Sequence, residues 1–352
     1  MAGLPLQKEQ LHQERKEHQS LRITLLVVLA VAAILISLLI GRYAITWAQL
    51  LAVFGSLFGN TPADLPANVE MVFFKIRLPR IIAAFIAGGG LALAGSVYQG
   101  VFRNPMVSPD ILGATAGAGL GAAIGLLFSF NDLGVQALSF VGGIIAVGLT
   151  YLVCKGVSKR SNTVLTLILT GMVITALFQA GISLVKFTAD PYSKLPAITF
   201  WLMGSLSSVI TKDVFVLLIP FVGGAIPLFL LRWRINLLSF SDEEAQAMGV
   251  NTQMLRLIVI ICSTLITASV VSVGGIIGWV GLIIPHLARI FVGPNFRALL
   301  PASIILGGTY LLVVDDFARG MMAMEIPLGI LTAIIGAPFF IYLMYKGRNG
   351  WS

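Results

Sequence analysis

Charged residues are scarce in this chain of 352 residues, because Lys, Arg, Asp and Glu together account for only 11% of it. Ordinary soluble domains contain roughly a quarter. Hydrophobic residues make up 57% of the chain, so the composition excludes an ordinary soluble protein. The formal net charge of +8 does not by itself indicate nucleic-acid binding, since membrane topology accounts for an excess of basic residues.

Residues suited to metal or covalent chemistry are scarce as well. The two cysteines, Cys154 and Cys262, lie in apolar sequence and are expected to be small packing residues. The three histidines show no metal-site spacing, and no haem attachment motif occurs. No Gly-x-x-x-x-Gly-Lys-Ser/Thr loop occurs either, which excludes ATP binding by that motif. We expect no catalytic site, no metal site and no bound cofactor, and a membrane-embedded enzyme is disfavoured.

Long uncharged runs are what the sequence does contain. Most of them reach the roughly 20 residues that a helix needs to cross a bilayer. If the longest run is divided near Val273-Gly274-Gly275, they give ten crossings. We therefore predict an all-α polytopic membrane protein, with about ten transmembrane helices in a compact bundle. The runs cover 23 to 41, 81 to 102, 111 to 131, 133 to 154, 161 to 185, 214 to 231, 257 to 288, 298 to 314 and 326 to 345.

The predicted domain organisation is one membrane domain at 22–346 between tails at 1–21 and 347–352. The segment from Met1 to Ser20 is long and mixed in charge, and no cleavage pattern follows it, so the first apolar run should remain as a span. With the N-terminus in the cytoplasm, most Lys and Arg residues fall on the cytoplasmic side. Both termini are therefore predicted to be cytoplasmic.

Small residues recur at helical spacing in two neighbouring runs. Glycine recurs every four residues from Gly113 to Gly125, and small residues do the same from Ala84 to Gly100. Such stripes allow helix backbones to approach closely. Between the stripes, Asn104-Pro105 should end one span at a cytoplasmic turn. Ser108-Pro109-Asp110 has the cap, the proline and the acid of a helix start, so a new span is expected from 111.

A polar island at 235–250 interrupts the apolar runs. Ser241 and Glu244 have the spacing of a capping box, Asp242 and Glu243 suit a helix N-terminus, and Gly249 can close the helix. We expect a short capped helix that projects into the cytoplasm. It is either a docking element for a partner or an ordinary solvated loop helix.

The apolar runs contain almost no intramembrane charge, and His286 is the only ionisable side chain well inside one of them. Proton- and ion-coupled carriers generally need such charges. Their scarcity favours energy supplied from outside the bilayer, although a secondary carrier or channel remains the alternative.

Six motifs in a fixed order resemble the permease subunits of ATP-binding-cassette (ABC) importers for ferric siderophores, haem and vitamin B12, the FecCD family. The resemblance runs from roughly 40 to 345. The motifs are Arg77-Leu-Pro-Arg80; Gly95-Ser-Val-Tyr-Gln99 with Arg103-Asn-Pro105, Pro109 and Leu112-Gly113; Trp201-Leu-Met-Gly-Ser205; Asn236-Leu-Leu to Ala245 and Gly249; Gly281-Leu-Ile-Ile-Pro-His286 with Arg289; and Asp315 to Arg319 with Glu325-Ile-Pro-Leu-Gly329.

The resemblance implies a multi-pass subunit of the bacterial cytoplasmic membrane that translocates a ferric siderophore or related iron chelate, with haem and cobalamin as further possibilities. It would pair with a second copy or a paralogue, and an extracytoplasmic binding protein would deliver the substrate. Two cytoplasmic ATPase subunits would supply the energy and dock on the 235–250 segment. The residues assigned to that coupling are Ser241, Asp242, Glu243, Glu244, Ala245 and Gly249.

Three arginines, Arg77, Arg80 and Arg319, are predicted on the outer face. There the resemblance implies docking of acidic residues on the binding protein, and the alternative is lipid-headgroup anchoring. His286 is either a structural hydrogen-bonding group or a substrate or proton site. Asp315 and Asp316 mark either a helix end or an ion site. The remaining motif residues are expected to be structural: Gln99, Arg103, Asn104, Pro105, Pro109, Gly113, Gly281, Pro285, His286, Arg289, Glu325, Pro327 and Gly329.

Overall fold

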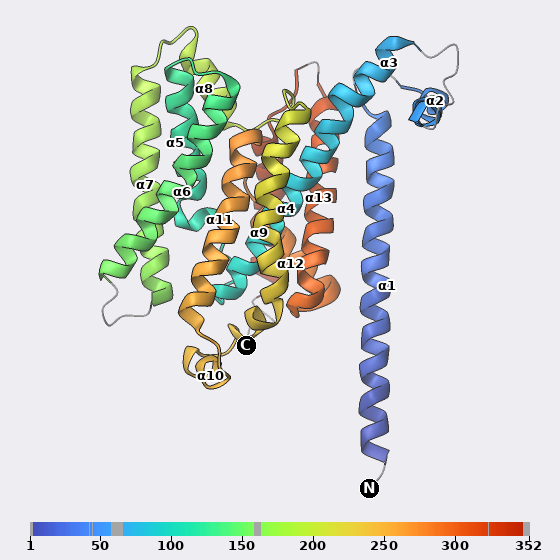
Figure 1. Cartoon of the computed structure of the whole chain (residues 1–352), viewed down its shortest axis with the longest axis vertical. Coiled ribbons are helices and arrows are strands. Elements are labelled where there is room, and N and C mark those ends of the chain that lie inside the picture. The colour runs from blue at the N-terminus through green and yellow to red at the C-terminus, as the bar shows by residue number, and fades with distance from the viewer. Residues whose placement is uncertain are drawn as a thin grey trace.

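The computed structural model describes residues 3–41, 43, 45–57, 66–157, 163–322 and 324–347, and within these ranges the chain is helical with no strand (Figure 1). The helices are α1 (Gly3–Leu39), α2 (Trp47–Leu57), α3 (Ala67–Met71), η1 (Val72–Arg77), α4 (Leu78–Val101), η2 (Pro109–Leu112), α5 (Ala114–Leu127), α6 (Asp132–Val157), α7 (Thr163–Thr188), α8 (Lys194–Leu202), α9 (Thr211–Leu237), α10 (Asp242–Ala247), α11 (Thr252–Gly274), α12 (Val280–Val292), α13 (Phe296–Gly320) and α14 (Leu328–Gly347).

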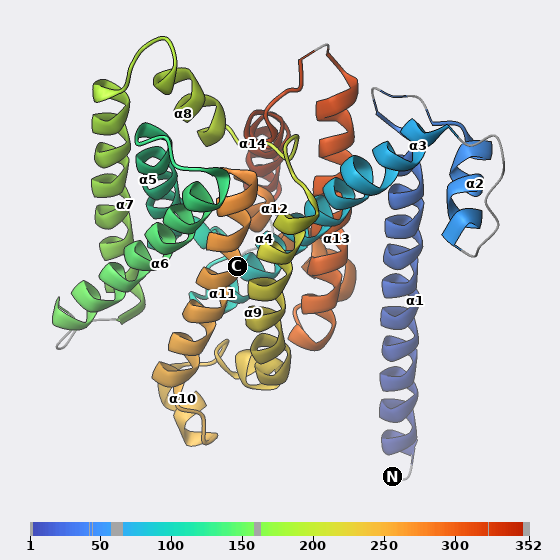
Figure 2. The same ribbon diagram turned by 45° about the horizontal axis from the view of Figure 1, so that its top comes forward.

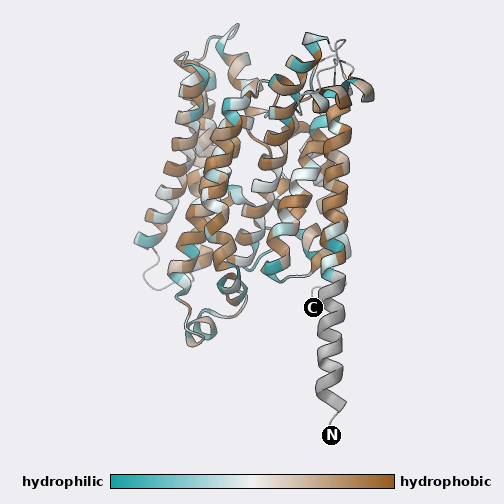
Figure 3. Ribbon diagram, turned by 45° about the vertical axis from the view of Figure 1, so that its right-hand side comes forward, coloured by the Kyte–Doolittle hydropathy of each residue, from teal (hydrophilic) through white to brown (hydrophobic). Residues whose placement is uncertain are grey.

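Eight of the described helices are long and apolar enough to cross a membrane. They are drawn mostly brown in Figure 3, with teal residues concentrated toward their ends. Three shorter apolar helices, at Trp47–Ser56, Ala114–Leu127 and Val280–Val292, lie between them. The polytopic all-α fold is therefore confirmed. The count of ten requires that α5 and α12 also cross, and it stays a prediction.

The bundle has two polar ends. At one end, which we call the α10 end, lie α10, the turn after α4 and the start of α1 (Figures 1 and 2). At the opposite end, the α8 end, lie α3, α8 and the turn between α13 and α14. The prediction that both chain termini face the cytoplasm would make the α10 end cytoplasmic.

Helix α4 forms the centre of the bundle, and α11 and α13 are the next most buried of the long helices. The predicted stripe of small residues on α4 meets α13, where a Cβ atom added to Gly88 would lie 2.2 Å from the carbonyl oxygen of Gly307. On α5, a Cβ at Gly117 would lie 2.3 Å from the carbonyl oxygen of Gly142 in α6. The two stripes therefore form close helix crossings, as the spacing predicts.

Several local features differ from the predictions. The span containing α4 begins at Asn68 and runs without a break to Val101, so Arg77 lies inside a helix and not at its start. The span expected from 111 is interrupted at Gly113, which lies between the end of η2 at Leu112 and the start of α5 at Ala114. Its φ of 88° is a backbone conformation that favours glycine. The helices α2 and α8 were not predicted. Helix α1 begins at Gly3, well inside the predicted tail.

The predicted division near Val273-Gly274-Gly275 is confirmed, since α11 ends at Gly274 and α12 begins at Val280. Between them the backbone is irregular, with positive φ at Gly275 (67°) and at Trp279 (70°). A bulky residue rarely adopts this conformation, so the surrounding structure must hold it. Non-helical backbone within a membrane protein is tolerated where protein buries it or where it lines a water-filled cavity.

Candidate functional site

Helix α10 is a short capped helix, as the sequence predicts. The Ser241 hydroxyl accepts a hydrogen bond from the Glu244 amide at 3.2 Å, and the Ser241 amide donates to the Glu244 carboxylate at 2.9 Å. Gly249 closes the helix with a φ of 80°. The backbone hydrogen bond from Ser241 holds the pKa of Glu244 below its usual value. The N-terminal part of the predicted 235–250 segment still belongs to α9, which ends at Leu237.

Asp242 fastens α10 to the bundle. Its carboxylate accepts hydrogen bonds from Arg256 at 2.5 and 2.8 Å and from Arg103 at 2.6 Å. Arg103, in the turn after α4, also donates to the carbonyl of Leu238 at 2.9 Å. The hydrogen bonds from Arg256, with the charge of Arg103, hold the pKa of Asp242 below its usual value. Three separate chain segments are therefore joined at one carboxylate.

The exposed surface of α10 is only partly acidic. Glu243 is exposed and, within the described ranges, makes no hydrogen bond or ion pair. Phe240 and Met248 beside it are 48% and 47% exposed. Asp242 and Glu244, which were predicted to share the partner-facing acidic surface with Glu243, instead have contacts inside the chain. Their coupling role stays a prediction, and Glu243, Phe240 and Met248 are exposed side chains that a partner could reach.

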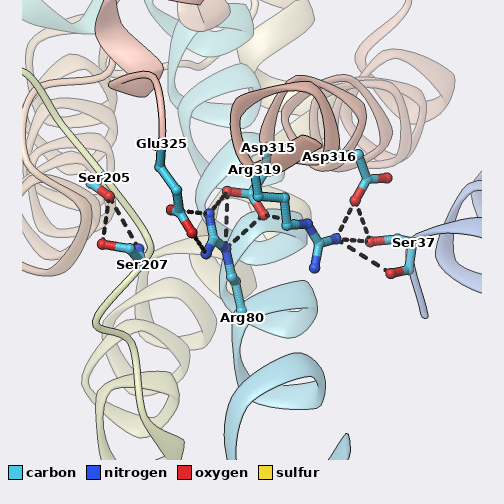
Figure 4. Close-up of polar contacts among 8 residues, drawn as sticks. All are labelled: Ser37, Arg80, Ser205, Ser207, Asp315, Asp316, Arg319 and Glu325. Atoms are coloured by element: carbon cyan, nitrogen blue, oxygen red, sulfur yellow. Dashed lines mark hydrogen bonds and ion pairs between the residues drawn. The ribbon is translucent and has the colours of Figure 1, made fainter. Parts of the chain in front are cut away.

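At the α8 end, Arg80 joins α4 to α13 and to the turn before α14 (Figure 4). Its Nε atom donates to the two Asp315 oxygens at 3.2 and 2.9 Å, and its Nη2 atom lies 2.9 Å from Asp315 Oδ1. The same guanidinium donates to the two Glu325 oxygens at 3.1 and 2.9 Å. A single arginine therefore pairs with two carboxylates in bidentate fashion.

A second set of polar contacts attaches α1. Arg319 pairs with Asp316 one turn earlier on α13 and lies 3.7 Å from Asp315, while Ser37 of α1 donates to Asp316 at 2.7 Å (Figure 4). Arg77 donates to the backbone carbonyl of Leu38 in the last turn of α1 and to that of Tyr43, just past the end of the helix. Together these contacts hold the end of α1 against α4 and α13.

Burial changes the interpretation of the three arginines. Arg77, Arg80 and Arg319 are only 3%, 6% and 6% exposed, and their guanidinium groups have partners within the chain. Docking of a binding protein on them stays a prediction, and direct pairing would require the internal contacts to open. The expectation of almost no intramembrane charge did not anticipate Asp315, because α13 continues past the uncharged run that ends at 314 and buries this carboxylate fully. Asp315 was not predicted to be buried because it directly follows the uncharged run at 298–314, where a helix end was expected.

Three segments of the chain meet near the α8 end. The Leu328 amide donates to the carbonyl of Gly204 at 2.9 Å, and Gly329 donates to Met203 at 3.0 Å. The Ser205 amide donates to the carbonyl of Gly274 at 2.9 Å. The start of α14, the turn after α8 and the end of α11 are thereby joined by backbone hydrogen bonds. Beside this junction lies an open hollow of about 510 Å³ whose lining is mostly apolar: Leu202, Met203, Ile276, Gly278, Trp279, Gly329, Ile330, Ala333 and Ile334.

The remaining motif residues form the contact between α4 and α12. Gln99 donates to the carbonyl of Leu282 at 3.0 Å and accepts a hydrogen bond from Arg289. A Cβ atom on Gly95 would lie 1.9 Å from the carbonyl oxygen of Gly281, and one on Gly281 would lie 2.7 Å from Pro109. These contacts pack α4 closely against α12, and the structural role assigned to these motif residues stays a prediction.

Other motif positions shape turns or helix interiors. Asn104 accepts a hydrogen bond from the Met106 amide at 2.9 Å in the turn that contains Pro105. Pro285 is buried inside α12, and the adjacent His286 is half-buried with no hydrogen bond to the described residues. The structural hydrogen bond expected of His286 is thus not found there. Pro327 precedes the first residue of α14.

Comparison with known protein families assigns this chain to a family. A model of the FecCD transport family matches residues 28–346. The chain belongs to this family. Among FecCD relatives, the molybdate import system permease MolB of Haemophilus influenzae is 42% identical over 92% of this chain and 95% of its own length. An iron chelatin transport system permease of Helicobacter pylori is 41% identical over 80% of this chain and 85% of its own length.

The fold agrees with this assignment. A solved structure of a metal-chelate type ABC transporter in an inward-facing conformation superposes with a TM-score of 0.83 and is 40% identical, covering 92% of this chain and 98% of that one. As a FecCD protein the chain is a multi-pass permease subunit of an ABC importer. The family implies a partnership with an ATPase and a binding protein, in which this chain is the transport permease subunit.

Proposed function

We propose that this FecCD permease imports a ferric siderophore or related iron chelate across the bacterial cytoplasmic membrane. The observation that supports this substrate class is the apolar hollow beside the junction of the start of α14, the turn after α8 and the end of α11. Its lining residues include no charged side chain, and Met203, Trp279 and Ile330 contribute apolar side chains to it. A bulky chelate with an organic shell suits such a surface, whereas a small hydrated ion would lose its water without gaining polar partners.

Molybdate is the second candidate, because the relative MolB is a molybdate permease and shares 42% identity with this chain. An oxyanion would need hydrogen-bond donors along its path. Backbone amides in the irregular segment between α11 and α12 are the available source of such donors at the hollow.

The energy would come from ATPase subunits that dock at the α10 end. The short helix α10 is suited to this role because Asp242 pairs with both Arg103 and Arg256. A displacement of α10 by the ATPase would therefore also displace α11 and the turn after α4. Delivery would occur at the opposite, α8 end. A second permease copy would complete the pathway, and the mostly outward-facing helices α7 and α14 offer the surface for it.

The substrate can be tested with the purified complex in proteoliposomes, with its binding protein supplied. We expect ATP-driven uptake of radioactive iron supplied as a chelate, and no uptake of radioactive molybdate. Competition separates the candidates further, since excess gallium chelate should suppress iron uptake and excess molybdate should not. Saturable uptake of molybdate that an iron chelate fails to inhibit would replace the chelate proposal with the oxyanion one.

A further inference from the structure

Helices α6 and α11 lie close together in the half of the bundle toward the α8 end and separate toward the α10 end (Figures 1 and 2). Where they touch, a Cβ atom added to Gly143 of α6 would lie 3.0 Å from the Cβ atom of Ala268 on α11. Further along α6, a Cβ atom added to Gly148 would meet nothing within 4 Å. Gly148 therefore does not serve a close helix contact, and the space beside it is open.

An open groove of about 200 Å³ lies in this space. Its lining residues follow each helix at intervals of three and four residues, from Ile144 to Tyr151 on α6 and from Leu257 to Leu265 on α11. Residues at this spacing share one face of a helix. At a rise of about 1.5 Å per residue, the groove extends roughly 10–12 Å along the helix axes. The groove is therefore narrow and elongated.

The groove offers an occupant almost no polar partner. Its described lining residues include no charged side chain. The hydroxyl of Thr264 is already used, because it donates to the carbonyl of Ile260 at 2.7 Å. A polar occupant would lose its hydration without regaining hydrogen bonds, so the groove suits a hydrocarbon.

The groove also faces the surroundings of the bundle. Ile144 and Ile261, on its two sides, are 41% and 56% exposed. Both α6 and α11 are long and apolar enough to cross a membrane, and both residues lie well inside these helices. The surroundings at this depth are the hydrocarbon core of the bilayer, so lipid acyl chains are the hydrocarbon that can enter.

A basic residue stands at the end of the groove toward the α10 end. Lys155 follows Tyr151 by four residues on α6, so the two side chains leave the helix on the same face. Lys155 is exposed and makes no hydrogen bond or ion pair with the described residues. Near the end of a membrane-spanning helix, a lysine side chain lies along apolar surface and extends its ammonium group to the polar interface. The ammonium group of Lys155 is thus available to a lipid phosphate.

We propose that the groove between α6 and α11 binds an acyl chain of an anionic phospholipid from the leaflet at the α10 end, with the phosphate paired to Lys155. The hydrocarbon lies beside Gly148, where the two helices leave room for it. A helix of another protein is about 10 Å across with its side chains, which is too wide for a groove of about 200 Å³. This lipid site is separate from the substrate hollow and does not depend on which substrate is transported.

Photo-cross-linking in nanodiscs tests the site. The assembled complex is placed in equal amounts of phosphatidylglycerol and phosphatidylethanolamine, and each lipid in turn carries a diazirine near the middle of one acyl chain. After illumination, mass spectrometry of peptides locates the attached lipid. Cross-links should concentrate on residues 144–151 and 257–265. Phosphatidylglycerol should exceed phosphatidylethanolamine there by about fivefold, the factor expected for one basic residue beside an anionic lipid.

Two variants separate the two parts of the site. Gly148→Leu fills the groove and should reduce these cross-links several-fold. Gly156→Leu is its matched control, because Gly156 is an exposed glycine of α6 outside the groove whose added Cβ also meets nothing within 4 Å. Lys155→Gln should keep the cross-links in the groove but bring the ratio of the two lipids close to one. Lys212→Gln, at an exposed lysine of α9 at the α8 end, should leave that ratio unchanged.

Three results would overturn the lipid site. One is equal cross-linking of the two lipids to the groove in the wild type. Another is a set of groove cross-links that Gly148→Leu leaves unchanged, or, if that variant fails to assemble, wild-type cross-links no denser in the groove than on the exposed face of α7. The third comes from a photoreactive benzoylphenylalanine at Ile144: attachment to a protein chain and not to lipid would assign the groove to a protein partner.

Discussion

Asp242 and Glu243 are neighbours on α10, but the structure predicts different roles for them. Asp242 pairs with Arg256, whose side chain is 8% exposed, whereas the Asp242 side chain is 42% exposed. Breaking a buried pair costs about 3–5 kcal/mol, and an exposed pair is worth about 0–1 kcal/mol. Since this pair is half-exposed, Asp242→Asn should weaken the attachment of α10 to the bundle by about 1–2 kcal/mol. The equilibrium between attached and detached α10, and with it the affinity for the ATPase, should change by a factor of about 5–30.

Glu243→Gln should act differently, because Glu243 is exposed and its charge is available to the ATPase. Removing one rim charge typically changes the association rate and its salt dependence. We expect Glu243→Gln to reduce the affinity of the ATPase for the permease by less than about 1 kcal/mol, or roughly fivefold, and this loss should disappear at high ionic strength. The loss caused by Asp242→Asn should persist there, since it comes from the internal attachment of α10.

The assay is the affinity of the purified ATPase for the permease in nanodiscs, measured at low and at high ionic strength. Glu70→Gln at the opposite end of the bundle is the matched control and should leave the affinity unchanged. The reasoning fails if Glu243→Gln costs more than Asp242→Asn, or if the effect of Asp242→Asn disappears at high salt.

Two other predictions concern packing and pH. Gly88→Ala places a methyl group 2.2 Å from the Gly307 carbonyl oxygen, so α4 and α13 must move apart. We expect this to lower the stability of the protein by about 1–3 kcal/mol. Size-exclusion chromatography after heating should show aggregation at a lower temperature than for the wild type. Gly148→Ala, whose added Cβ meets nothing within 4 Å, should be neutral or stabilising, and equal behaviour of the two variants would contradict the packing account. Because Arg256 and Arg103 lower the pKa of Asp242 below 3.8, the attachment of α10 is stable above that pH and is lost as the pH falls through the lowered value. Hydrogen-exchange protection of α10, corrected for intrinsic rates, should therefore be constant from pH 8 to pH 5, and a loss near pH 6 would show that another group controls the helix.

The sequence predicted the parts of the fold that depend on local chemistry. Apolar runs long enough to span a bilayer gave the long helices, and the spacing of Ser241 and Glu244 gave the capping box of α10. The close crossing at Gly88 followed from four-residue spacing of small side chains. Each of these features is set by residues within a few turns of one another.

Features that depend on contacts distant in sequence were not predictable in the same way. Arg80 and Asp315 are 235 residues apart, and no local pattern indicated that they pair. The arginines therefore looked like free outer cations, although the fold provides them with carboxylates and carbonyls. Helix α8 was missed because its nine residues are too short for a span. The interruption at Gly113 was missed because cap signals before it already suggested a helix start.

ATP-driven uptake in a reconstituted system tests the central claim most directly. The permease is placed in proteoliposomes with its ATPase, the binding protein is supplied on the side of the α8 end, and radioactive iron chelate is the substrate. We predict uptake that requires ATP, the binding protein and an intact α10 together, and that ceases when any one is removed. Uptake that continues without ATP and binding protein, driven by an ion gradient, would contradict the account and establish a secondary carrier.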